Sequence, residues 1–151
     1  MRVSQEGRRD AGRTGVRGWL LVLCLLLLVW NPLSFGLAAS GVLAALPLRG
    51  LPLAMVLVGR LLVTALGIAS GLALLARRPA AVTLALIALI ASAAADLFVY
   101  LTPYWPSNRL PGDTVWYIAG SALYHAAWLL YLVRSTRVRN TYHGNGHEPG
   151  S

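Results

Sequence analysis

Apolar residues run along this chain in four long blocks, separated by short polar or proline-containing stretches. The blocks cover residues 19–46, 53–76, 80–101 and 114–133, and they are apolar throughout rather than at a spacing that leaves one face polar. A helix needs about 20 apolar residues to cross the hydrocarbon core of a bilayer. The pattern therefore predicts an all-α fold, a polytopic membrane protein with a bundle of four transmembrane helices.

The composition supports a bilayer as the solvent of this chain. Of its 151 residues 57% are hydrophobic and 12% are charged, whereas about a quarter of the residues of a soluble domain are charged. The stretches that flank the blocks, 1–18 and 134–151, are polar, and the first of them is rich in arginine. We expect a disordered basic cytoplasmic arm over 1–18, a transmembrane domain over 19–133, and a basic juxtamembrane segment with a disordered cytoplasmic tail over 134–151.

Arginine placement predicts the orientation of the four spans. All thirteen basic residues are arginines; of those outside the blocks, ten fall on the side of the two termini and only Arg49 and Arg109 fall on the other. Cytoplasmic segments carry the excess of Lys and Arg. We therefore expect both termini in the cytoplasm, with the arginines meeting anionic lipid headgroups rather than nucleic acid.

The second and third blocks each contain one charged residue, Arg60 and Asp96. At about 1.5 Å per residue, Arg60 lies about 10 Å and Asp96 about 7–8 Å below the same outer boundary. Isolated charges in hydrocarbon are costly, and consecutive helices joined by a tight turn are usually neighbours. The sequence favours an intramembrane ion pair between them, which would fix the register of the two helices. The alternative is that each side chain reaches interfacial water separately.

The fourth block carries His125 near its middle, one turn after Ser121. A histidine at this depth is either one member of a polar relay with Ser121 or a structural residue that donates a hydrogen bond nearby; the latter is the commoner arrangement. Helical spacing also predicts an aromatic and polar stripe, which would pack against other helices or line a lipid or quinone-like groove. The stripe consists of Tyr117, Ser121, Tyr124, Trp128 and Tyr131.

Two features predict the shape and packing of the first two helices. Pro32 lies inside the first block, where its missing N–H and its ring disturb a helix, so we expect a kink. Gly67 and Gly71 form a G-x-x-x-G pattern in the second block. Such a pattern allows close helix packing, either within the bundle, which we favour, or between two copies of the chain.

No arrangement of residues typical of catalysis or cofactor binding is present. The chain has no H-E-x-x-H or G-x-S-x-G motif and no glycine-rich phosphate loop, and its single cysteine, Cys24, excludes an intrachain disulfide. His143 and His147 lie in the polar tail, where solvated side chains are the simpler interpretation. We therefore predict no enzyme activity, no cofactor and no metal.

The string from Trp128 to Tyr142 is the most distinctive part of the chain. It resembles the closing signature W-x-x-Y-x-x-x-S-x-R-V-x-x-T-F of the YdgK-like family of small bacterial inner-membrane proteins of unknown function, with Tyr142 in place of Phe, and Gly18-Trp19-Leu20 resembles the opening of that family. The juxtamembrane part of the signature contains Ser135, Arg137, Val138, Arg139, Thr141 and Tyr142.

The resemblance implies a four-span protein of the bacterial inner membrane with cytoplasmic ends, and it implies no activity. From the residues themselves we expect Val138 and Tyr142, four positions apart, to lie on the membrane surface in a short helical continuation. The predicted function is that of a non-enzymatic accessory or interaction protein, whose partner is another membrane protein or a second copy. The alternative is a small transporter or proton-coupled membrane subunit that uses Arg60, Asp96 and His125.

Overall fold

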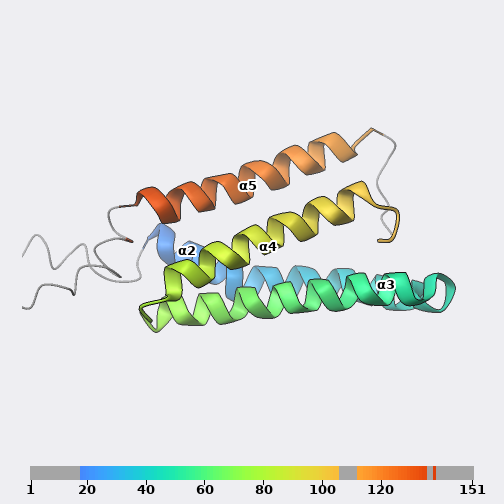
Figure 1. The fold of residues 1–151 in the computed structure, drawn as a ribbon, viewed down its shortest axis with the longest axis horizontal. Coiled ribbons are helices and arrows are strands. Elements are labelled where there is room, and N and C mark those ends of the chain that lie inside the picture. Colours follow the sequence, from blue (N-terminus) through green and yellow to red (C-terminus); the bar gives the residue numbers. More distant parts are fainter. Residues whose placement is uncertain (1–17, 106–111, 136–137, 139–151) are drawn as a thin grey trace, which may run out of the picture.

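The structure is a computed structural model that describes residues 18–105, 112–135 and 138. These residues form helices and contain no strand, in the order α2 (Trp19–Leu25), the π-helix η1 (Leu26–Trp30), α3 (Asn31–Leu75), α4 (Ala81–Leu101) and α5 (Thr114–Arg134). Figure 1 shows the helices as long rods side by side, with α4 packed against both α3 and α5. The predicted all-α class is confirmed.

A π turn interrupts the first helix where the sequence predicts a kink. The five residues of η1 end directly before Asn31 and Pro32. Proline has no N–H to donate, and its ring collides with the carbonyl group four residues earlier, which here belongs to Leu28. A π turn widens the helix by one residue per turn and so makes room for that ring.

The first and second helices are joined by a single non-helical residue, Gly50. Its φ of 62° and ψ of −147° break α3 into two helices that run past each other, and this positive φ is the conformation that glycine adopts without strain. Pro52 follows at the start of the second helix, where a missing N–H costs nothing. The connection that the sequence predicts over 47–52 is thus much shorter, and the second helix begins at Leu51, two residues before the predicted boundary at 53.

Gly67 and Gly71 bring the second helix against the π turn of the first. A Cβ added at Gly67 would lie 2.8 Å from Asn31 Nδ2, and one added at Gly71 would lie 2.8 Å from Leu28 Cγ. Both glycines are buried. The G-x-x-x-G pattern is therefore used for packing within one chain, which is the favoured of the two predicted uses.

A Schellman motif ends α3 and turns the chain into α4. The N–H of Arg78 donates to the carbonyl of Ala73 (3.0 Å), and the N–H of Arg77 donates to that of Leu74 (3.2 Å). Arg77 holds the left-handed position of this motif, with a φ of 52°. An arginine therefore stands where glycine is the usual residue.

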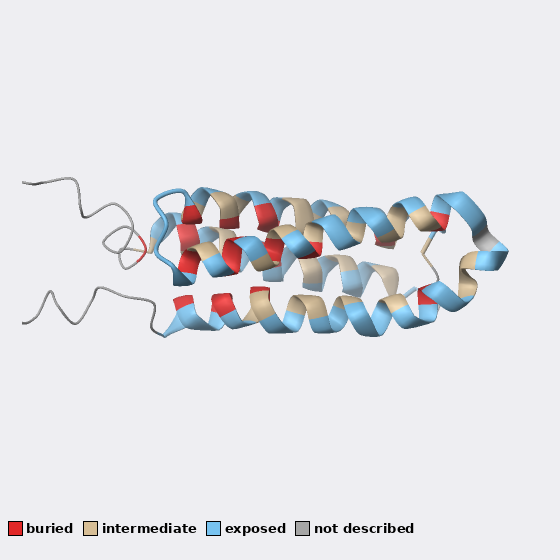
Figure 2. Cartoon of the chain, turned by 90° about the horizontal axis from the view of Figure 1, so that it is seen from below, coloured by how far each residue is buried: buried red, intermediate tan, exposed pale blue. Residues whose placement is uncertain are grey.

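Burial is concentrated at the end of the bundle where the described chain begins and ends (Figure 2). Trp19 of α2 contacts Trp128 of α5 there, with 6.4 Å between ring centroids. Cys24 is buried in the same region, where its free thiol packs as an apolar group. The core cluster consists of Leu20, Leu23, Cys24, Leu27, Leu74, Ala81, Ala85, Leu89, Leu132 and Val138.

Among the described residues, three helical segments are long and apolar enough to cross a membrane, namely Trp19–Leu48, Gly50–Leu75 and Ala81–Leu101. They correspond to the predicted spans 19–46, 53–76 and 80–101. The fourth helix, α5, has 21 residues and matches the block predicted over 114–133, but it is not among these three segments. Its hydroxyl, imidazole and indole groups make it more polar than the others.

Candidate functional site

Arg60 of α3 and Asp96 of α4 form an ion pair inside the bundle. The Nη1 of Arg60 donates to Oδ1 of Asp96, and the two side chains are 27% and 18% exposed. The two helices that carry them are in contact. The structure thus brings together the charged residues of the second and third apolar blocks, which are 36 positions apart in the sequence.

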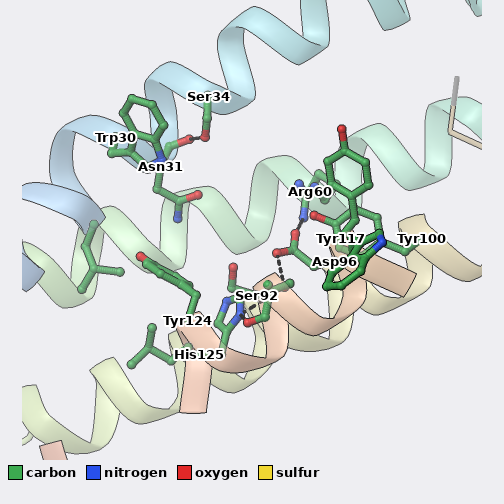
Figure 3. A pocket seen from close by; sticks show the side chains of 15 residues that line it. Trp30, Asn31, Ser34, Arg60, Ser92, Asp96, Tyr100, Tyr117, Tyr124 and His125 are labelled. Carbon is green, nitrogen blue, oxygen red and sulfur yellow. Dashed lines mark hydrogen bonds and ion pairs between the residues drawn. The ribbon is translucent and has the colours of Figure 1, made fainter. Parts of the chain in front are cut away.

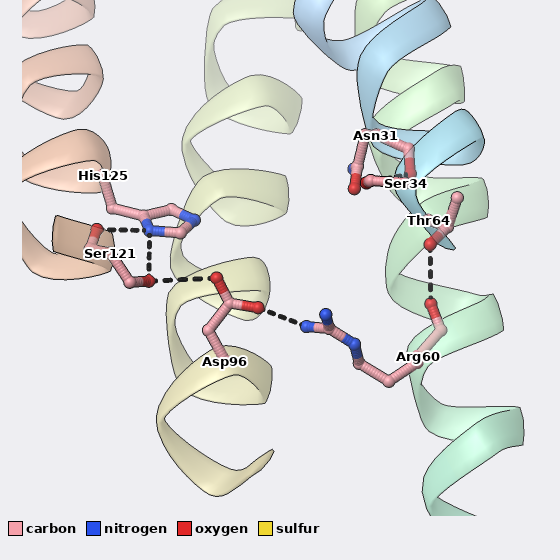
Figure 4. Close-up of polar contacts among 7 residues, drawn as sticks. All are labelled: Asn31, Ser34, Arg60, Thr64, Asp96, Ser121 and His125. Atoms are coloured by element: carbon pink, nitrogen blue, oxygen red, sulfur yellow. Dashed lines mark hydrogen bonds and ion pairs between the residues drawn. The ribbon is translucent and has the colours of Figure 1, made fainter. Parts of the chain in front are cut away.

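Ser121 and His125 of α5 extend this pair into a connected polar chain (Figure 4). The Oγ of Ser121 donates to Oδ2 of Asp96 (3.0 Å). The Nδ1 of His125 lies 2.8 Å from the carbonyl oxygen of Ser121 and 3.3 Å from its Oγ. Because a carbonyl oxygen only accepts, Nδ1 carries the proton in this arrangement. Asp96 therefore receives hydrogen bonds from both sides, from Arg60 and from Ser121.

The second ring nitrogen of His125 has no such partner. The residue is 4% exposed, and its Nε2 is a buried polar atom without a hydrogen bond among the described residues. Figure 4 shows Nε2 on the side of the ring that faces away from Ser121. Buried polar groups are nearly always hydrogen-bonded. With the proton on Nδ1, the Nε2 of a neutral imidazole is a free acceptor.

A cavity of about 480 Å³ surrounds this polar chain (Figure 3). It lies between the first helix, the second half of α3, α4 and α5, and its volume is within the range of small-molecule sites, about 300–1,000 Å³. Five of its fifteen lining residues are aromatic. The residues are Leu27, Trp30, Asn31, Ser34, Arg60, Leu89, Ser92, Asp96, Tyr100, Trp116, Tyr117, Gly120, Ser121, Tyr124 and His125.

Helical spacing explains which residues meet at the cavity. Each helix contributes positions three or four apart, as in Leu89, Ser92, Asp96 and Tyr100 of α4, which share one face. The predicted aromatic and polar stripe of α5 divides into two parts. Tyr117, Ser121 and Tyr124 line the cavity, whereas Trp128 and Tyr131 pack against the core cluster.

The sequence pattern does not predict every polar residue of the cavity lining. Those that it does not predict are Asn31, Ser34 and Ser92. Ser92 stands one helical turn before Asp96, so this spacing is a signal that could have placed it. Asn31 and Ser34 belong to the helix after the π turn, and no spacing within one helix relates them to Asp96.

Arg60 also faces a second, apolar groove between α3 and α4. The groove has a volume of about 320 Å³, and Arg60 is its one charged lining residue. The guanidinium carbon of Arg60 lies 6.0 Å from the centroid of the Trp105 ring. The remaining lining residues are Met55, Val56, Gly59, Val63, Ala95, Phe98 and Val99.

Only part of the juxtamembrane motif lies within the described residues. The N–H of Val138 donates to the Oγ of Ser135 (3.5 Å), and Val138 is 1% exposed inside the core cluster. The prediction that Val138 lies on the membrane surface is therefore wrong: its side chain gains more contact by closing the end of the bundle. Arg137, Arg139, Thr141 and Tyr142 lie outside the described residues.

Within the described part of the chain, no group of three His, Cys, Asp or Glu side chains is placed to hold a metal ion. No family model, curated protein or solved structure matches the chain. The resemblance to the YdgK-like family therefore stays a prediction, and the case for a function depends on the cavity and its side chains.

Proposed function

We propose that the chain is a four-span protein of the bacterial inner membrane with both termini in the cytoplasm. The described ends of the chain lie together with the Arg77–Arg78 turn at one end of the bundle, as Figure 1 shows. That arrangement supports placing the arginine-rich segments on one side of a membrane. α5 would be the fourth span, with its polar residues turned toward the cavity and the other helices rather than toward lipid.

We further propose that the protein is a small transporter or a proton-coupled membrane subunit, and that the cavity is its binding site. The observation that carries this proposal is the cavity itself, which joins Arg60, Asp96 and His125 in one space. A scaffold would be expected to fill the interior around these groups with packed side chains. Charged and titratable residues that share a cavity inside a membrane are typical of solute or proton pathways.

The polar chain suggests how a proton would be held. A proton taken up at Nε2 would make His125 cationic, and its charge would be stabilised by Asp96 through the hydroxyl of Ser121. Arg60 forms an ion pair with Asp96 and so fixes the position of the carboxylate. In this proposal His125 binds the proton, while Arg60 and Ser121 position the carboxylate that stabilises it.

Solvent access to the cavity tests this proposal without knowledge of a ligand. Single cysteines at Ser92 and Gly120, introduced after Cys24→Ala, would be treated with a membrane-impermeant thiol reagent from the outer side of intact cells. Both positions line the cavity, and a Cβ at Gly120 meets nothing within 4 Å. We expect both cysteines to be labelled.

Matched controls lie on the same two helices. Ala94 and Leu123 are exposed but are not among the cavity-lining residues, so cysteines there would face lipid and stay unlabelled. If Ser92→Cys and Gly120→Cys react no faster than Ala94→Cys and Leu123→Cys, the cavity is dry and the transport proposal is wrong.

A second candidate is the accessory or interaction protein that the sequence favours. One observation supports it, namely that Val138 is packed into the end of the bundle. The basic string on both sides of Val138, which includes Arg137 and Tyr142, would be the segment that a partner binds. If Arg137→Ala and Tyr142→Ala leave membrane insertion and every in-cell crosslink unchanged, docking through this string is excluded.

A further inference from the structure

The cavity contains one acceptor that the protein leaves unused, the Nε2 of His125. The residue lines the cavity and is only 4% exposed, and its other ring nitrogen, Nδ1, is bonded to Ser121. A buried acceptor without a hydrogen bond is unfavourable, because it has lost its contact with water and gained none in return. A ligand that brings an N–H or O–H to this atom recovers that cost, and a ligand that offers only acceptors does not.

The remaining chemistry of the cavity excludes an anion on the side of His125. Figure 4 shows the guanidinium of Arg60 and the imidazole of His125 on opposite sides of the Asp96 carboxylate. Arg60 is engaged by that carboxylate through Nη1. An anionic group near His125 would therefore face the Asp96 carboxylate and the Nε2 lone pair, both of which are rich in electrons.

The walls of the cavity favour a positive charge. The lining includes the rings of Trp30, Tyr100, Trp116, Tyr117 and Tyr124, and the faces of such rings attract organic cations. Trp30 and Trp116 are 61% and 79% exposed and belong to the first helix and α5. They give the apolar part of a ligand aromatic surface on two sides of the cavity.

We propose that the cavity binds an organic amine cation with an apolar substituent, and that the ammonium N–H and a proton compete for Nε2 of His125. The inference rests on the proposed transport function and names the class of its ligand. The ammonium group donates to Nε2 and is further stabilised by the nearby Asp96 carboxylate, while the substituent packs among the aromatic rings. Because one lone pair takes either the amine or the proton, binding one of them releases the other.

The other ionisable groups of the cavity do not offer the same competition. Apart from His125, the charged or titratable lining residues are Arg60 of α3, Asp96 and Tyr100 of α4, and Tyr117 and Tyr124 of α5; the first helix contributes none. Among side chains of ordinary acidity, only histidine changes its charge between about pH 5 and pH 8. His125 is the histidine that lines the cavity. A pH dependence over this interval that is lost in His125→Gln is therefore assigned to His125 and not to His143 or His147 of the tail.

The test is calorimetric titration of the full chain in lipid nanodiscs, against empty nanodiscs, with three probes of the same skeleton. The probes are 2-phenylethylammonium, its N-trimethyl analogue, which has no N–H, and the neutral 2-phenylethanol. We expect saturable binding of the primary amine, with about tenfold or greater weakening for each of the other two. We also expect its affinity to fall as the pH is lowered from about 8 to about 5.

Two variants of His125 separate a binding role from a structural one. In His125→Asn the amide N–H can take over the hydrogen bond of Nδ1, but no atom of the side chain reaches the position of Nε2. We therefore expect about tenfold weaker amine binding. In His125→Gln the longer amide reaches toward the position of Nε2, so binding is partly restored but no longer depends on pH. Leu123→Ala, which is outside the cavity lining, should bind as the unchanged chain does.

Several outcomes would overturn this inference. If the trimethyl analogue binds as tightly as the primary amine, the N–H is not the recognised feature. If the alcohol binds as tightly, the positive charge is not the recognised feature. If no probe shows saturable binding while the cavity cysteines are still labelled, the cavity contains water but does not bind the amine. The amine proposal would then be wrong, and the proposal of a solvent-accessible cavity would be kept. If the cavity cysteines are not labelled, both the transport proposal and the amine proposal are wrong. A pH dependence that persists in His125→Gln would exclude competition at Nε2.

Discussion

Arg60 of α3 and Asp96 of α4 form an ion pair, and the Asp96 carboxylate is held between the guanidinium of Arg60 and the hydroxyl of Ser121. Three helices are thereby connected through one side chain. Removing Asp96 would leave Arg60 charged within the bundle, and removing Arg60 would leave Asp96 charged there. The pair is consequently worth more as a link between helices than a surface ion pair of the same geometry.

Reversing one of the two charges should destabilise the bundle, and reversing both should restore it. Arg60→Asp places two carboxylates together, and Asp96→Arg places two cations together, so each single variant should lose about 3 kcal/mol or more of unfolding free energy. The double variant Arg60→Asp/Asp96→Arg should recover part of this loss. Unfolding in detergent measures all three. A double variant no more stable than the single ones contradicts the pairing.

Alanine at Gly71 should be more harmful than alanine at Gly67 or Gly59 of the same helix. The added Cβ at Gly71 would lie 2.8 Å from Leu28 Cγ, an atom that is not the free end of its side chain, so we expect a loss of about 1–3 kcal/mol. At Gly67 the near atom is Asn31 Nδ2, which can swing away at smaller cost. Gly59→Ala, with nothing within 4 Å, is the control and should be neutral. Detergent unfolding would rank the three, and the opposite ranking would exclude this packing.

Replacing Arg77 by glycine should stabilise the turn between α3 and α4. Arg77 adopts a left-handed backbone conformation, with a φ of 52°, that costs an L-residue about 1 kcal/mol and glycine almost nothing. The unfolding free energy of Arg77→Gly should therefore rise by about 0.5–1 kcal/mol. Arg78 comes after the left-handed residue, so Arg78→Gly should not raise the unfolding free energy. A loss of stability in Arg77→Gly would mean that the arginine side chain has a structural role.

The proposed topology predicts two different results from reporter fusions. Alkaline phosphatase fused after Thr102, beyond the third candidate span, should lie outside the cytoplasm and be active. Fused to the end of the full chain it should be inactive, and a green fluorescent reporter there should fluoresce, because α5 returns the chain to the cytoplasm. Equal phosphatase activity of both fusions would show that α5 does not cross.

The sequence predicts the helices and the meeting of their polar groups well, for simple reasons. A fixed rise per residue sets the depth of Arg60 and Asp96, and the helical repeat sets Ser121 one turn from His125. The cavity could not be predicted in the same way. It depends on how each helix is rotated about its own axis relative to its neighbours. A helix that is apolar on nearly all sides gives little information about that rotation.

Val138 illustrates the same limit at the end of the chain. Its position among arginines indicates a membrane surface, yet it is buried with Leu20 and Leu132 of two other segments. That burial depends on where α5 ends relative to α2, which is a distance between helices rather than a property of the local sequence. The connection at Gly50 was likewise predicted as a longer turn, because Pro47 and Pro52 are both tolerated within the adjoining helices.

The π turn before Pro32 amounts to one residue more than an unbroken α-helix would need between the two parts of the first helix. Deleting Val29 should remove it and join the two parts into an unbroken α-helix that keeps their relative orientation. Leu20, Leu23 and Cys24 would stay in the core cluster, and Asn31 and Ser34 would keep their places at the cavity. We expect the loss of stability to be limited to the clash of the Pro32 ring with the preceding turn, and the Cys24 thiol to stay protected from a lipid-soluble reagent. One surplus residue thus gives Pro32 room without changing the rotation of the core relative to the cavity.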